Sequence, residues 1–144
     1  MAVLLARRGY IVVIPQHTDG SSSLVLLKGG KDLPHSHPQL VSAHLLTLGD
    51  FGVVGAREEG VTGVFVGGRK IASVGVKVRR WTTMHGIGVN VGRESLGNFQ
   101  GIKPCGMDRD VTCLEDCCDR EVTVEVFGEA FCRAFEKVFN CVWK

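Results

Sequence analysis

The alternation of apolar and polar positions is clearest in the middle of the chain. Residues 61–66 are rich in β-branched and aromatic side chains, and residues 70–78 follow the two-residue period of a strand. Gly67 and Gly68 between them are typical of a two-residue β-hairpin turn. A third strand, rich in small residues, is predicted over 82–91, so the three segments form an antiparallel meander.

Side chains of residues 70–78 point alternately to the two faces of the predicted sheet. The expected core face carries Ala72, Val74, Val76 and Val78. The opposite face carries Ile71, Ser73 and Gly75. The small side chains of this second set leave space beside the strand, whereas the valines of the first set are suited to a buried layer.

The last third of the chain changes to a helical period. Two apolar rows recur at four-residue spacing and form one broad face of an amphipathic helix. They are Val122, Val126, Ala130, Ala134 and Val138, and Phe127, Phe131, Phe135 and Phe139. The aromatic row is interpreted as packing against a sheet. Upstream, Thr112 and Glu115 fit a capping box, which predicts a helix start there.

The first sixty residues have an irregular pattern with short apolar runs. Residues 11–14 predict a strand, and residues 24–27 predict a second, buried strand. Pro34 and Pro38 are expected to keep the next stretch out of a regular helix or central strand. This part of the chain is therefore expected to contribute little regular structure.

Composition indicates an ordinary globular domain. The chain has 144 residues, 44% of them hydrophobic and 22% charged, which excludes a fully disordered chain and fits one domain over residues 1–144. A net charge of +2 is too small to suggest a nucleic-acid partner. The apolar runs are far shorter than the roughly 18–20 residues of a membrane span, so we expect none.

Six cysteines raise the question of disulfides or metal. The first residues make no convincing secretory signal, because the apolar run at 2–6 is short and two arginines follow it. We therefore expect reduced thiols and an intracellular protein. Cys113, Cys117 and Cys118 lack the paired spacing of a zinc site, so no metal is expected.

Lys70 and Cys105 are the strongest candidates for chemistry. Lys70 starts a predicted strand, and Cys105 lies in a Pro-Cys-Gly turn after the small-residue strand. A thiol needs a nearby cation to become a nucleophilic thiolate at neutral pH, and Lys70 can supply it if the meander brings the two together. Taken singly, Cys105 is more typical of a small buried residue, and Lys70 of a surface lysine at a strand end.

Three sequence elements around these residues occur in a characteristic order. They read Lys-Ile-Ala-Ser-Val-Gly at 70–75, Arg-Trp-Thr-Thr-Met-His-Gly-Ile-Gly-Val-Asn-Val at 80–91, and Phe-Gln-Gly-Ile-Lys-Pro-Cys-Gly at 99–106. In this order they resemble the lipoyl(octanoyl) transferases, which are octanoyl-carrier-protein:protein octanoyltransferases of lipoate biosynthesis. The resemblance is best over residues 63–144. It is partial over 28–41, where the positions that match the family's Arg-Gly-Gly element are Gly29, Gly30, His35, Gln39, Leu40 and Val41.

The resemblance implies an α/β (α+β) fold like the biotin/lipoate ligase catalytic domain, with a mixed, mainly antiparallel sheet and packed helices. It implies an acyltransferase without a cofactor. Cys105 would take octanoyl from octanoyl-acyl carrier protein as a thioester and pass it to a lysine of a lipoyl domain, while Lys70 lowers the pKa of Cys105 and moves protons. Acceptors would be lipoyl domains of 2-oxoacid dehydrogenases and glycine cleavage H-type proteins. The compartment would be the mitochondrion in a eukaryote or the cytoplasm in a bacterium.

The same resemblance assigns contacts with the acyl group to three parts of the chain. The residues implied are Lys28, Gly29, Gly30, Lys31, His35, Ser73, Val74, Gly75, His85, Gly86, Ile87 and Gly88. For His85, a role as a hydrogen-bonded core histidine is an equally good interpretation. Backbone N–H groups near Cys105 are candidates for stabilising the oxyanion.

The chain departs from the family pattern in its first part. The loop at 28–41 lacks the family's Thr-Tyr pair and Gly-Pro-Gly turn. The N-terminal region is reduced, and the short, Gly-rich stretch at 41–61 stands where the family has a longer segment with a helix. Two alternatives stay open: an inactive member that binds a carrier or lipoyl domain, and, ranked lower, an ATP-dependent lipoate or biotin ligase.

Overall fold

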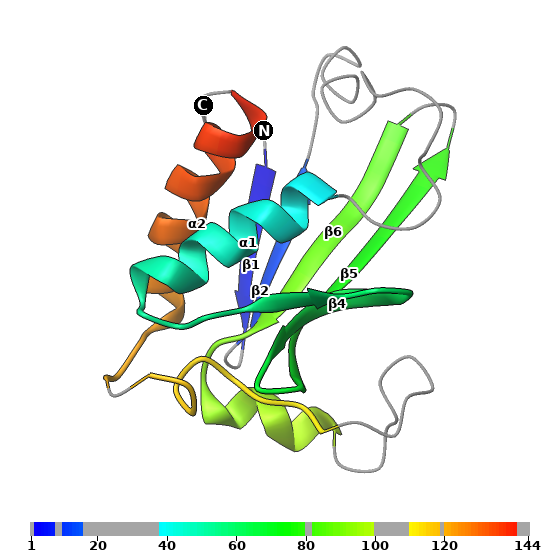
Figure 1. Ribbon diagram of the computed structural model, residues 1–144. Helices are drawn as coiled ribbons and strands as arrows, with labels where there is room; N and C mark the ends of the chain where they lie inside the picture. Colours follow the sequence, from blue (N-terminus) through cyan, green and yellow to red (C-terminus); the bar gives the residue numbers. More distant parts are fainter. Residues whose placement is uncertain are drawn as a thin grey trace.

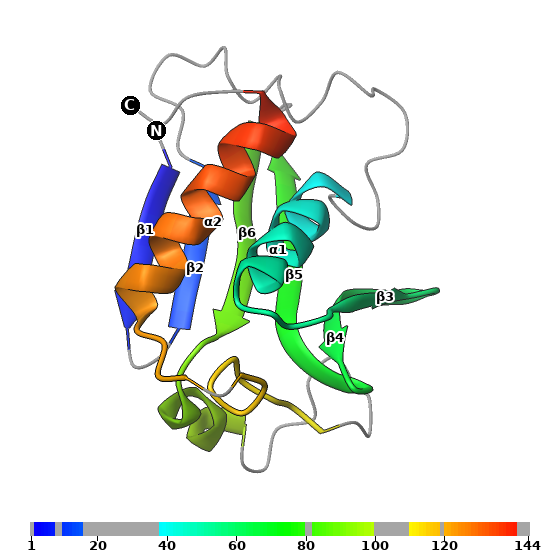
Figure 2. The ribbon, with the colours of Figure 1, turned by 60° about the vertical axis from the view of Figure 1, so that its left-hand side comes forward.

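Six strands form one sheet covered on one face by two helices. The computed structural model describes residues 2–7, 10–15, 38–79, 82–99, 110–118 and 120–140. The strands pair antiparallel in the order β1-β2-β6-β5-β4-β3. Figures 1 and 2 show α1 and α2 on the same side of the sheet, with α2 over β1 and β2. The predicted class, a mainly antiparallel sheet with packed helices, is confirmed.

The bounds of the elements are as follows. The strands are β1 (Ala2–Arg7), β2 (Tyr10–Pro15), β3 (Ala56–Glu58), β4 (Val61–Val66), β5 (Arg69–Arg79) and β6 (Thr82–Asn90). The α-helices are α1 (Pro38–Asp50) and α2 (Val124–Phe139), and η2 (Arg93–Phe99) is a 3-10 helix. The predicted strands at 11–14, 61–66, 70–78 and 82–91 are confirmed, whereas the expected strand at 24–27 lies outside the described residues.

The core lies between the helices and one face of the sheet. Phe127 and Phe131 of α2 are fully buried, and the four phenylalanines of the predicted aromatic row all belong to the core. Their rings continue along the helix, with centroids 6.3 Å apart for Phe127 and Phe131 and 4.0 Å for Phe135 and Phe139. The interpretation of this row as core packing is therefore confirmed. Val126 of the other row is 53% exposed and lies at the edge of the apolar face.

Helix α2 is capped by Thr123, and no helix begins at Thr112, where the sequence predicted a start. The side chain of Thr123 accepts a hydrogen bond from Val126 N at 3.4 Å, which satisfies one of the free N–H groups of the first turn. Residues 110–118 contain turns and no helix, so the capping box at Thr112 and Glu115 is wrong. Thr112 is instead fully buried, and its N–H pairs with β5.

Helix α1 contradicts the expectation of irregular structure before residue 60. Pro38 is its first residue, a position where proline is tolerated because the first N–H groups of a helix have no intrahelical partner. Leu40, Val41 and Leu48 lie on its buried face. The expectation that proline excludes a helix here is therefore wrong, and the stretch at 41–61 includes most of α1. The helix is followed by Gly52, whose φ of +75° favours glycine.

The β4–β5 hairpin confirms the predicted turn but breaks the predicted alternation. Gly67 and Gly68 have φ values of +56° and +76°, as a two-residue turn with two positive φ angles requires. Val64 pairs with Ala72 but Phe65 pairs with Lys70, so β5 carries one extra residue at this point. Such a bulge shifts the phase of the strand. Ile71 therefore joins Ala72 in the core, although the sequence placed it on the opposite face.

Candidate functional site

Lys70 is a buried residue on the face of the sheet that the helices leave uncovered. Only 3% of its surface is exposed, so it is not the surface lysine that its position at a strand end also allowed. Its cross-strand partner is Phe65, and Lys70 Nζ lies 6.0 Å from the centre of that ring. Val64 belongs to the core under the helices, and neighbours along a strand point to opposite faces. Phe65 and Lys70 therefore lie on the face away from α1 and α2.

Gly63 provides the space that the Lys70 side chain occupies. A Cβ built on Gly63 would lie 2.6 Å from Lys70 Cε and 2.7 Å from the carbonyl oxygen of Ala72. Both distances are shorter than van der Waals contact, and Gly63 also has a φ of +143°, which favours glycine. The Lys70 side chain thus lies against the backbone of Gly63, where any larger residue would place its Cβ.

A floor of small residues continues from Lys70 along β5 and β6. Ser73 pairs with Gly88, and Gly75 pairs with Gly86. Residues directly opposite in an antiparallel pair point to the same face, and their neighbours Ala72 and Val89 belong to the core on the other face. A Cβ built on Gly75 or Gly88 would meet none of the described residues within 4 Å.

Val74 and Ile87 are the other two predicted contact residues on this part of the sheet. They pair with each other, and both pack into the core beneath the helices. Their side chains therefore support the small-residue floor from behind, and only their backbone can reach a molecule on the open face. This division between core side chains and open-face glycines follows from the register of β5 and β6.

Residues 110–112, which follow Cys105 in the sequence, are hydrogen-bonded to Lys70 from backbone to backbone. Lys70 N–H donates to Asp110 O at 3.0 Å, and Thr112 N–H donates to Lys70 O at 2.9 Å. Lys70 and Val111 form a parallel bridge, so this segment lies beside the start of β5. Cys105 itself lies outside the described residues, as do the predicted contacts Lys28, Gly29, Gly30, Lys31 and His35. For His85 the structure describes the backbone in β6 and not the side chain.

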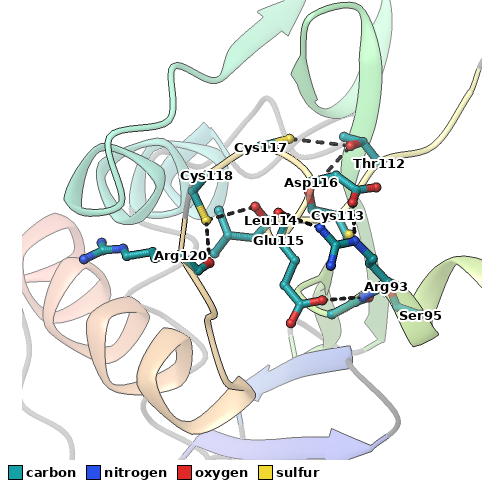
Figure 3. Close-up of polar contacts among 11 residues, drawn as sticks. Arg93, Ser95, Thr112, Cys113, Leu114, Glu115, Asp116, Cys117, Cys118 and Arg120 are labelled. Carbon is teal, nitrogen blue, oxygen red and sulfur yellow. Dashed lines mark hydrogen bonds and ion pairs between the residues drawn. The ribbon is translucent and has the colours of Figure 1, made fainter.

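Residues 110–118 are fastened to the sheet end by Arg93. Arg93 Nε lies 2.6 Å from Asp116 Oδ1, and this hydrogen bond is the main cause that raises the pKa of Arg93. Arg93 N–H also donates to Glu115 Oε2 at 3.0 Å. Figure 3 shows these contacts at the start of η2. These contacts anchor residues 115–116, whereas the backbone contacts with Lys70 hold residues 110–112.

The three cysteines of residues 110–118 are buried or make hydrogen bonds within their own segment. Burial raises the pKa of the Cys113 thiol to about 11, so it is protonated at neutral pH. Cys117 Sγ lies 3.5 Å from Thr112 Oγ1, and Cys118 donates to Leu114 O at 3.1 Å. Figure 3 shows these two thiols pointing to different partners. Among the described residues, no group of three or more His, Cys, Asp or Glu side chains could hold a metal ion.

A cavity of about 810 Å³ lies beside this segment, away from the small-residue floor. Arginine and carboxylate side chains line it, among them Arg69, Arg93, Asp116 and Glu121. Ligand sites for apolar groups are lined mainly by apolar surface, which this cavity lacks. The open face of β5 and β6 is therefore the better place for an apolar chain.

Two residues of the site were not recognised from the sequence. Gly63 lies in a predicted strand, where a glycine inside the pattern was the available signal of a close backbone approach. Asn90 ends β6, is 5% exposed, and donates from Nδ2 to Thr112 O at 3.0 Å. Its polarity at the end of an apolar strand was the signal for it.

The helices of the described residues include none long and apolar enough to cross a membrane.

Comparison with known proteins identifies relatives over most of this chain. The family model of the lipoyl protein ligase A/B catalytic domain matches residues 20–136. An octanoyltransferase of Gloeobacter violaceus is 50% identical over 93 residues, which are 65% of this chain and 41% of that protein. An octanoyltransferase of Rhodospirillum rubrum is 37% identical over 132 residues, which are 88% of this chain and 60% of that protein. The chain thus spans about half the length of the curated relatives it matches.

Solved structures agree with this assignment at the level of the fold. A bi-partite lipoate protein ligase from Thermoplasma acidophilum has a TM-score of 0.58 at 14% identity, covering 94% of this chain and 51% of that one. A biotin protein ligase from Aquifex aeolicus has a TM-score of 0.57 at 12% identity, covering 92% of this chain and 53% of that one. With the family match over most of its length, the chain belongs to the lipoyl protein ligase A/B catalytic domain family.

Proposed function

We propose that the protein transfers an octanoyl group from octanoyl-acyl carrier protein to a lysine of a lipoyl domain. The observation that carries this proposal is the buried Lys70 beside a floor of glycines, with the segment that follows Cys105 hydrogen-bonded to the Lys70 backbone. The octanoyltransferase names of its relatives support the choice of acyl group. The acceptors are lipoyl domains of 2-oxoacid dehydrogenases and glycine cleavage H-type proteins, in a bacterial cytoplasm or a mitochondrion.

Cys105 begins the reaction as the nucleophile. Its thiolate attacks the carbonyl carbon of the donor thioester, and the carrier thiolate leaves with a proton from the Lys70 ammonium. Octanoyl is then held on Cys105 as a new thioester. The amine of the acceptor lysine attacks this thioester, its proton passes to Lys70, and the Cys105 thiolate leaves. An amide forms, a thioester breaks, and no ATP is consumed.

The open face of β5 and β6 receives the acyl chain in this proposal. Ser73, Gly75, Gly86 and Gly88 present little side-chain bulk on that face. An extended hydrocarbon chain can therefore lie against the backbone beside Lys70 and bury its apolar surface. The 28–35 loop and His85 are proposed to contact the same chain.

Intact-protein mass spectrometry tests this proposal. The protein is incubated with octanoyl-acyl carrier protein and no ATP, beside Cys105→Ala and, as a matched control, Cys113→Ala. We expect a mass gain of one octanoyl group on the native chain and on Cys113→Ala, and none on Cys105→Ala. Adding a lipoyl domain then moves the group to the acceptor.

Other outcomes contradict the proposal in separate ways. A folded native chain that takes no octanoyl group and still binds the carrier or lipoyl domain is an inactive binding protein. Transfer that requires ATP and free acid indicates a ligase, which the shared fold also accommodates. Circular dichroism on each sample shows whether the chain is folded.

A further inference from the structure

Thr112 is held to two neighbouring strands through the two ends of its backbone. Its N–H donates to Lys70 O at 2.9 Å, and its carbonyl accepts from Asn90 Nδ2 at 3.0 Å. The first contact is of the kind that any residue can make in a sheet. The second depends on the amide of one side chain, so it is the contact that a substitution removes.

Asn90 also contacts the same segment through its backbone. Its carbonyl accepts from Leu114 N at 3.0 Å, and the carbonyl of the next residue, Val91, accepts from Glu115 N at 3.1 Å. The end of β6 therefore follows residues 112–115, while the start of β5 holds residues 110–112 through Lys70. The Asn90 amide is the side-chain link where these two sets of contacts meet.

Burial makes the hydrogen bond from the Asn90 amide to Thr112 costly to lose. Asn90 is 5% exposed and Thr112 is fully buried. Water therefore cannot reach this place to replace a lost hydrogen bond, and losing the bond costs free energy. Without the amide, the Thr112 carbonyl must stay unsatisfied or move to find a donor. A movement of Thr112 therefore affects Lys70, whose carbonyl accepts the Thr112 N–H and whose own N–H donates to Asp110 O.

We propose that Asn90 is a positioning residue whose amide holds residues 110–112 against Lys70 and thereby supports the action of Lys70 on the Cys105 thiol. The inference rests on the proposed function, in which Lys70 stabilises the Cys105 thiolate. Cys105 precedes Asp110 by five residues, a chain length that reaches at most about 18 Å. Displacing the anchor at 110–112 therefore weakens the interaction between thiolate and ammonium, which falls as the charges separate.

Thiol alkylation measures this effect without any acyl substrate. The rate of Cys105 modification by iodoacetamide is followed from pH 5 to 10 by peptide mass spectrometry, on the full chain and on Asn90→Leu, Lys70→Met and the double variant. Leucine resembles asparagine in shape and has no donor. We expect each single variant to raise the pKa of Cys105, with Asn90→Leu lowering the rate at pH 7 about tenfold for a rise of one unit. In the Lys70→Met background, Asn90→Leu adds no further change.

Thr47→Val provides a matched control for lost stability. Thr47 is fully buried in α1, and its hydroxyl donates to Ala43 O at 2.8 Å, so this variant also loses a buried hydrogen bond to a backbone carbonyl. We expect its Cys105 pKa to match the native value. Asn90→Ser is a second variant, for use if the leucine variant does not fold. It replaces the amide by a small polar hydroxyl group.

Three results overturn the inference. In the first, the folded Asn90 variants keep the native Cys105 pKa. In the second, Asn90→Leu raises that pKa equally with and without Lys70, which means that the amide acts on the thiol by another route. In the third, Lys70→Met itself leaves the Cys105 pKa unchanged; this result contradicts the proposed role of Lys70 and is distinguishable from the other two.

Discussion

The Lys70 side chain packs against the backbone of Gly63. The lysine lies where a Cβ on Gly63 would stand 2.6 Å from Lys70 Cε and 3.3 Å from Nζ. Position 63 therefore decides whether the ammonium can occupy its place on the open face of the sheet. The bulge beside Lys70 contributes as well, because it turns Ile71 into the core and leaves Lys70 paired with Phe65.

Gly63→Ala is expected to lower octanoyl transfer by about tenfold or more, because the new methyl group displaces the Lys70 side chain. Gly60→Ala is the matched control: Gly60 also has a positive φ, +74°, but a Cβ there meets none of the described residues within 4 Å. Both variants carry backbone strain, and only the first changes the site. Equal rates of Cys105 acylation in the two folded variants would contradict a role for Gly63.

Gly88→Val is expected to shorten the acyl chain that the protein accepts. The valine side chain would occupy the open face beside Ser73, where the proposal places the hydrocarbon chain. Acylation of Cys105 by octanoyl carrier should fall while acylation by a butyryl carrier is kept, as measured by intact mass over time. Gly49→Ala, at an exposed position in α1, serves as the control. An unchanged octanoyl-to-butyryl ratio would place the chain elsewhere.

Cys113 is expected to resist alkylation at neutral pH. Burial raises its pKa to about 11, so almost no thiolate is present at pH 7. In the same digest, the Cys105 peptide should be modified at least about tenfold faster, if Lys70 stabilises its thiolate as proposed. Modification of Cys113 at the rate of Cys105 in the folded protein would show that the thiol is not buried as described.

His44 is expected to make the protein less stable in mild acid. It is fully buried between α1 and α2, its ring centre is 5.7 Å from that of Phe127, and neither ring nitrogen has a hydrogen-bond partner among the described residues. Burial lowers the pKa of His44 to about 3, whereas an imidazole in the unfolded chain titrates near 6.5. Between these values the unfolded state binds a proton that the folded state does not, so stability rises with pH.

Urea unfolding at pH 7 and pH 5 measures this contribution. The native chain should lose about 2 kcal/mol more of its free energy of unfolding than His44→Leu between the two values, because the leucine variant lacks the titrating group. Above pH 7 the histidine is neutral in both states and contributes no slope. Equal losses in the two proteins would mean that His44 can be protonated while folded.

Much of the fold followed from periodicity along the chain. The meander of β4, β5 and β6 has regular spacing and a Gly-Gly turn, and the phenylalanine row of α2 repeats every four residues. The elements that were missed are those with mixed signals. Helix α1 begins at a proline, and Thr112 resembles a helix cap, yet its N–H is used by β5. In such places long-range pairing outweighs the local preference.

The amino-acid sequence by itself singled out the candidates for chemistry, which are Lys70, Cys105 and the glycines of the small-residue strand. It also determined the strands and the helix that hold a strong period. Only the tertiary structure decided that Lys70 is buried beside Gly63, and that residues 110–112 run alongside it under the Asn90 amide. The physical reason is that these contacts join residues far apart in the sequence through backbone hydrogen bonds and close approach, and neither leaves a periodic trace in a single chain.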